Sequence, residues 1–172
     1  MTYKAPLKKS RIKFEGLFDI EGLYKFMRDW LSTRHFIFTE SKYKHKLPSP
    51  LGAEIELEWS AWRKETEFVR YWIIINFHFW DMTEVEVIRE GKKVKRNKAR
   101  FEIVFGGDLE MDYQGRFEKT PFLKTLEQFY YKFIFTQNKE MGMYWDELYY
   151  LVYRLQTEVK KFLGMEASES AY

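Results

Sequence analysis

Two alternating apolar segments joined by a short turn constrain the fold of this chain more than any other feature. Apolar residues recur at every second position on both sides of Glu90-Gly91, with Val85 and Val87 before the turn and Phe101, Ile103 and Phe105 after it. A period of two is typical of β-strands with one buried face. The segment therefore predicts an antiparallel hairpin over residues 84–105.

The tip of this hairpin is strongly basic. Residues 89–100 contain a single acid, Glu90, and carry +6, whereas the whole chain carries +3. The seven cations are Arg89, Lys92, Lys93, Lys95, Arg96, Lys98 and Arg100. If Phe101 faces the core, Lys93 and Lys95 lie on the same side, and a core cannot accept unpaired lysines. We therefore expect the tip to project beyond the sheet as an arm, with its cations unneutralised and available to an anionic partner.

The N-terminal segment adds to this charge asymmetry. Residues 1–13 carry five cations and no acid, so together with residues 89–100 they hold +11, and the remainder of the chain holds −8. Such segregation favours a polar molecule with one binding face. We expect residues 1–10 to be a basic arm, residues 11–164 to form a single domain and residues 165–172 to be a flexible tail.

Periodicity in the rest of the chain predicts an α+β fold. Asp19 is a suitable N-cap for an amphipathic helix over residues 20–32. Alternating segments predict about five or six antiparallel strands in a meander. Thr120-Pro121 begins a first C-terminal helix, and a second apolar stripe runs from Trp145 to a C-cap at Gly164. This element order resembles a helix-grip arrangement, in which a curved sheet wraps a helix.

Two glycines and two charge runs have structural interpretations. Gly106-Gly107 lacks the Lys and Ser or Thr of a phosphate loop, and we interpret it as a bulge. One strand alternates Lys42, Lys44 and Lys46, and the next alternates Glu54, Glu56 and Glu58. Antiparallel pairing would lay these side chains beside one another. We interpret them as an exposed ion ladder in preference to an acidic metal site.

The three histidines do not indicate a metal or catalytic centre. His35, His45 and His78 lie in separate segments, and none forms a recognised ligand pair. His78 with Asp81 could orient a general base, but a structural hydrogen bond explains this pair better.

One row of acids is a weaker candidate for catalysis. Asp108, Glu110 and Asp112 alternate and could hold Mg²⁺ for phosphoryl chemistry, but the sequence offers no second set of ligands. We interpret them as an outward-facing row, and we predict no catalytic residue, no metal and no cofactor.

Aromatic residues make up 20% of the chain. Most belong in the core, but Trp62, Trp72 and Trp80 fall opposite the main apolar stripe, where a tryptophan could stack on bases, line a pocket or anchor a partner. The segment around Trp72 and Trp80 is so apolar that we expect both faces of its strand to be covered. For a pocket between the last helix and the sheet, the candidate lining residues are Phe77, Phe105 and Trp145.

The absence of cysteine excludes disulfides and thiolate metal sites and favours a reducing compartment such as the cytoplasm. The most apolar window, residues 71–80, is about half as long as a membrane span requires, so we expect no membrane span.

Three motifs resemble those of an uncharacterised family of small archaeal proteins. They are the segment from Phe14 to Tyr24, the Phe79-Trp80-Asp81-Met82 corner and Pro121-Phe122-Leu123. The resemblance covers residues 11–165. It implies a fold but no activity, because none of these motifs carries known chemistry.

The function that these features favour is that of a non-catalytic binding or assembly protein whose basic hairpin contacts the phosphates of RNA or of a ribonucleoprotein surface. The hairpin could equally be a charged protrusion that only prevents aggregation. The remaining alternatives are a carrier of a small hydrophobic, lipid-like ligand and a self-assembling or viral structural subunit. The sequence leaves the oligomeric state open.

Overall fold

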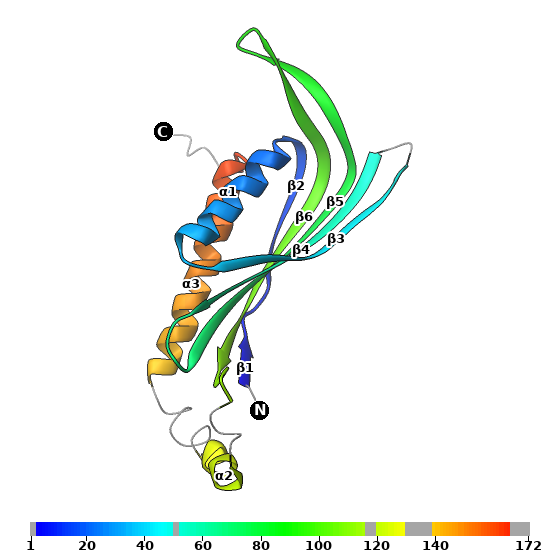
Figure 1. The fold of residues 1–172 in the computed structure, drawn as a ribbon. Coiled ribbons are helices and arrows are strands. Elements are labelled where there is room, and N and C mark those ends of the chain that lie inside the picture. The colour runs from blue at the N-terminus through cyan, green and yellow to red at the C-terminus, as the bar shows by residue number, and fades with distance from the viewer. Residues whose placement is uncertain (1–2, 50–51, 116–119, 130–138, 166–172) are drawn as a thin grey trace, which may run out of the picture.

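The computed structural model describes residues 3–49, 52–115, 120–129 and 139–165, and its strands form one antiparallel sheet (Figure 1). The elements in chain order are β1 (Tyr3–Pro6), β2 (Ser10–Phe18), α1 (Ile20–Thr33), β3 (Ile37–Ser49), β4 (Gly52–Lys64), β5 (Val69–Arg89), β6 (Lys92–Met111), α2 (Pro121–Phe129) and α3 (Lys139–Phe162). The strand order is β1-β6-β5-β4-β3, and β2 also pairs with β6. The predicted α+β class and antiparallel sheet are confirmed.

The sheet is curved, and helices α1 and α3 both lie against its concave face (Figure 1). Buried side chains from the two helices and from the central strands form one core between them. The helix residues of this core include Leu23, Met27 and Leu31 from α1 and Leu148, Val152, Leu155 and Val159 from α3. None of the described helices combines the length and the apolar character that crossing a bilayer requires.

The predicted helix ends are confirmed where the structure describes them. Asp19 caps α1, because its Oδ1 accepts a hydrogen bond from the Gly22 N–H at 2.9 Å. Thr120 Oγ1 accepts from the Leu123 N–H at 3.2 Å, and α2 begins at Pro121. At the end of α3, Gly164 has a φ of 66° and closes the helix. The later part of the predicted first C-terminal helix and the tail from residue 166 lie outside the described residues.

Part of the N-terminal segment is a strand. Tyr3–Pro6 pairs with β6 as β1, and Lys4 lies opposite Glu110. The sequence did not predict this pairing, since four residues with a proline give little strand signal.

The interpretation of Gly106-Gly107 as a bulge is wrong. Pairing between β5 and β6 continues through both glycines without a shift of register. A Cβ on Gly107 would lie 2.7 Å from the Trp72 carbonyl oxygen and 3.1 Å from the Leu7 side chain. Glycine is therefore needed at position 107 for close packing.

The convex face of the sheet lies opposite α1 and α3 (Figure 1). Trp72, Ile74 and Trp80 point to this face and are partly exposed. The expectation that both faces of β5 are covered is therefore wrong for this part of the strand, because the two helices that form the core with it pack on one side only. The partly exposed tryptophans leave the convex face available for contacts.

Candidate functional site

The basic hairpin projects beyond the rest of the sheet (Figure 1). Strand β4 pairs with β5 no further than Met82, and β2 pairs with β6 no further than Asn97. Residues 83–98 therefore form the projecting end of the hairpin, which we call the ribbon and which has only two strands beyond the pairing of Phe18 with Asn97. Its turn residues, Glu90 and Gly91, have φ angles of 52° and 76°. Left-handed conformations at both positions are typical of a tight two-residue hairpin turn.

A bulge at the root of the ribbon decides which way its charges face. Trp80 pairs with Arg100, but the next pair is Thr83 with Lys98, so β5 contains one extra residue. Asp81, within this bulge, has a φ of 55°. The extra residue reverses the faces of all the β5 residues that follow. Without it, Glu84 would lie opposite Arg96.

Two lysines of the ribbon are paired because of this bulge. Glu84 and Glu86 now share a face with Lys95 and Lys93, on the concave side of the sheet. The Nζ of Lys95 lies 2.7 Å from Glu84 Oε1, and the Nζ of Lys93 lies 3.5 Å from Glu86 Oε2. The hydrogen bond to Glu84, with the negative charge of that carboxylate, raises the pKa of Lys95.

The other five cations lie on the convex side: Arg89, Lys92, Arg96, Lys98 and Arg100. Arg96 Nη1 is 3.4 Å from Asp19 Oδ2, and Arg100 Nη2 is 3.8 Å from Asp81 Oδ2. Within the described part of the chain, Arg89, Lys92 and Lys98 have no carboxylate oxygen within 4.0 Å. The expectation of seven unneutralised cations is therefore wrong for four of them, and it holds for the remaining three.

Trp80 lies at the root of the ribbon, on the same convex face. Its ring stacks on the His78 imidazole with centroids 3.9 Å apart, and the Arg100 guanidinium carbon lies 5.4 Å from its centre. A surface hollow of about 580 Å³ is lined by Trp80 together with Lys13, Phe14, Glu15, Arg100, Phe101 and Glu102. A second hollow, of about 320 Å³, lies on the His78 side.

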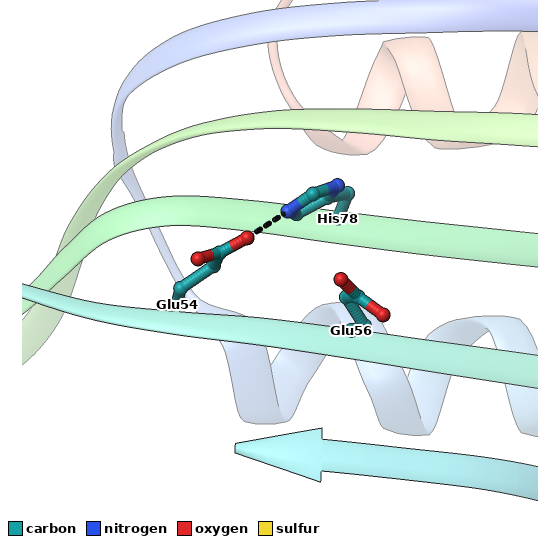
Figure 2. Close-up of side chains that lie close together, drawn as sticks. All are labelled: Glu54, Glu56 and His78. Carbon is teal, nitrogen blue, oxygen red and sulfur yellow. Dashed lines mark hydrogen bonds and ion pairs between the residues drawn. The ribbon is translucent and has the colours of Figure 1, made fainter. Parts of the chain in front are cut away.

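His78 also meets two carboxylates of β4 (Figure 2). Its Nε2 lies 2.7 Å from Glu54 Oε1, and ligand atoms of His78, Glu54 and Glu56 all lie within 4.8 Å of one another. One nitrogen and two carboxylates are a ligand set that Zn²⁺ accepts. A tetrahedral zinc site holds its ligand atoms roughly 3.4 Å apart, as follows from bond lengths near 2.0–2.1 Å, so these side chains would have to close further around an ion.

The carboxylates of Glu54 and Glu56 also belong to the run of acids in the predicted ion ladder. In register, Lys42 lies opposite Glu58, Lys44 opposite Glu56 and Lys46 opposite Glu54, as the sequence predicted. The partner of His78 is Glu54, across the β4–β5 pairing, whereas the predicted partner Asp81 faces Arg100. The sequence pattern did not find the contact with Glu54 because it depends on the register between β4 and β5, which alternation alone leaves undetermined.

The predicted outward row of acids is wrong for two of its three members. Glu110 and Asp112 are 6% and 1% exposed. Arg70 Nε donates to Glu110 Oε2 at 2.7 Å, and the indole N–H of Trp72 donates to the same oxygen. The Arg70 guanidinium also lies over the rings of Trp62 and Trp72. These two tryptophans therefore enclose a buried ion pair, in contrast to Trp80.

The three candidate pocket residues belong to the interior or its edge. Phe77 and Phe105 are 4% and 0% exposed, and Phe77 packs against Trp59 with ring centroids 4.9 Å apart. Trp145 is partly buried against the core and stacks on Tyr149. A ligand pocket lined by these residues stays a prediction.

Comparison with known protein families finds no family model that matches this chain, and no curated protein matches it either.

Proposed function

We propose that this protein binds RNA without catalysis, with the convex side of the ribbon in contact with the phosphate backbone. The observation that carries the proposal is the gathering of five cations on one side of the projecting ribbon and its root, three of which have no carboxylate partner among the residues that the structure describes. Cations at this density release counterions when they meet a polyphosphate, which is the main source of sequence-independent affinity.

The paired cations do not prevent such contact. Arg100, whose side chain is 60% exposed, lies 3.8 Å from Asp81, and exposed pairs contribute only about 0–1 kcal/mol, so its guanidinium can exchange the carboxylate for a phosphate at little cost. Arg96 is only 25% exposed and lies 3.4 Å from Asp19, so it would exchange its carboxylate less readily. Lys93 and Lys95, on the other side, are held by Glu86 and Glu84 and contribute less in this proposal.

The charges of the convex face also suggest where the RNA runs. On the β2 side of Trp80, Lys13 and Arg100 balance Glu15 and Glu102, whereas the β4 side carries the three acids Glu54, Glu56 and Glu58. Repulsion from these acids, only partly offset by the opposing lysines, would keep phosphates on the β2 side. A ribonucleoprotein surface would be recognised through the same phosphates, and we place this binding in the cytoplasm.

A second candidate function follows from the shape of the sheet. A curved sheet around a long helix is what a helix-grip carrier of a small hydrophobic ligand would have, and Phe77, Phe105 and Trp145 lie between those layers or at their edge. Native mass spectrometry of freshly purified protein tests this candidate: a copurified lipid supports it, and an unliganded mass counts against it.

The RNA proposal is tested with two double variants that remove the same number of charges from the same ribbon. Lys92→Gln/Lys98→Gln acts on the convex side, and Lys93→Gln/Lys95→Gln acts on the other. In fluorescence anisotropy with a labelled 20-nucleotide RNA, we expect the first variant to lose about tenfold in affinity and the second less than about threefold. Equal losses in both variants would contradict the assigned side, and absence of binding by the unchanged protein would refute the function.

A further inference from the structure

The hollow at the ribbon root combines an aromatic ring with cations. Trp80, Arg100 and Lys13 line it on the convex face, and its volume of about 580 Å³ is within the range of small-molecule pockets. An adjoining hollow of about 380 Å³ shares Arg100 and continues to Lys98 of the ribbon. The cationic side of the ribbon is thus continuous with a recess that contains an indole.

Unpaired bases are the part of a nucleic acid that such a recess suits. Aromatic rings and arginine guanidiniums stack on base faces, and each stacked base contributes about 1–3 kcal/mol. In an RNA duplex the bases are stacked on one another, and mainly phosphates and 2′-hydroxyls are presented to a protein. Stacking on Trp80 would therefore add nothing to the binding of a duplex.

Two carboxylates in the hollow add hydrogen-bond acceptors, which a base can use and a phosphate cannot. Glu15 and Glu102 line the hollow with Trp80. Glu102 is held 3.2 Å from Arg11 Nη1. A carboxylate repels phosphate but accepts hydrogen bonds from the amino group of a base. In register, Glu15 lies opposite Arg100 and Glu102 lies opposite Lys13, so each acid of the recess has a cation beside it. The recess thus combines an aromatic ring and hydrogen-bond acceptors for a base with cations for the adjoining phosphates.

We infer that the RNA bound by the ribbon is single-stranded, with one unpaired base stacked in the hollow beside Trp80. This inference rests on the proposed function and adds a substrate class to it. The phosphates next to that base would contact Lys98 and Arg100, which lie two residues apart on the same face of β6, about 7 Å along the strand.

The test compares a single-stranded 12-nucleotide RNA with a duplex of the same strand, using the unchanged protein and three variants. Trp80→Ala removes the ring, and Trp80→Phe keeps an aromatic face. Trp62→Ala removes a tryptophan of β4 from the same face. Trp62 lies opposite Trp72 of β5, and Trp72 is eight residues, or about 27 Å, from Trp80 along that strand. Circular dichroism checks that each variant is folded.

We expect the unchanged protein to bind the single strand at least fivefold more tightly than the duplex. Trp80→Ala should abolish that preference and leave duplex affinity unchanged, Trp80→Phe should restore most of it, and Trp62→Ala should have no effect. Equal binding of both RNAs, or a preference that survives Trp80→Ala, overturns this inference but leaves the phosphate contacts of the ribbon intact. Absence of binding to both RNAs would instead refute the proposed function.

Discussion

At the residue scale, charge and burial conflict most strongly at Glu110. Its side chain is 8% exposed and accepts hydrogen bonds from Arg70 and from the indole of Trp72. A buried carboxylate is stable only when it is paired and hydrogen-bonded. Glu102, which lies eight residues before Glu110 on β6, also forms an arginine pair, but its partner Arg11 is 65% exposed, whereas Arg70 is 20% exposed.

Replacing these two glutamates by alanine should therefore have very different effects. Glu110→Ala leaves the Arg70 guanidinium and the Trp72 N–H without their acceptor in a partly buried position, and we expect it to lower the free energy of unfolding by about 3 kcal/mol. Glu102→Ala, the matched control, should cost less than about 1 kcal/mol. Urea unfolding of both variants measures the difference, and similar values would contradict the described environment of Glu110.

At the element scale, two features of β5 matter: a bulge that orients the ribbon side chains and a hydrogen bond that joins the strand to α3. The bulge in β5 reverses the faces of the ribbon and so separates its paired lysines from its convex cations. Near the start of β5, the Tyr71 hydroxyl donates to Glu147 Oε2 of α3 at 3.1 Å and ties the helix to the sheet. Burial, with the neighbouring negative charge of Glu147, raises the pKa of Tyr71 well above its usual range.

This tyrosine predicts a specific loss of stability in alkali. Because the pKa of Tyr71 is higher in the folded than in the unfolded chain, its contribution is fully present below about pH 10 and is lost as the pH rises beyond that value. Tyr71→Phe should be less stable at pH 7 by about 1–2 kcal/mol, because the hydrogen bond to Glu147 is lost, but its stability should fall less steeply above pH 10.

Urea midpoints between pH 7 and pH 11 provide the measurement. Tyr153→Phe controls for the loss of one phenol, because Tyr153 is an exposed tyrosine of α3, the helix that Tyr71 contacts. If Tyr71→Phe and the unchanged protein declined in parallel above pH 10, Tyr71 would not be the group responsible.

At the scale of the whole molecule, two surfaces have different roles. The concave face of the sheet holds α1 and α3 and most of the core, whereas the convex face carries the partly exposed tryptophans and the cationic side of the ribbon (Figure 1). Most of the core therefore lies on one face, and on the other the buried Arg70–Glu110 pair is confined to the end of the sheet far from the ribbon.

The features that the sequence predicted correctly are local ones. The caps at Asp19 and Gly164 and the turn at Glu90-Gly91 depend on residues within a few positions of each other. The pairing of the lysine and glutamate runs was also accessible, because one hairpin joins them.

The features that it missed depend on distant segments. A single extra residue at Asp81-Met82 is invisible to an alternation pattern, yet it decides that Lys93 and Lys95 are paired. Glu110 is buried because Arg70 and Trp72 of β5 lie over it, and β1 pairs along its strand. Such contacts follow from the register between strands, which local patterning leaves undetermined.

The most direct test of the central claim is the salt dependence of RNA binding by the unchanged protein. If the three to five convex cations contact phosphates, the logarithm of the association constant should fall against the logarithm of the salt concentration with a slope between about −2 and −3.5 for a single strand. A slope near zero, or no measurable binding at low salt, would show that the ribbon does not engage a polyphosphate.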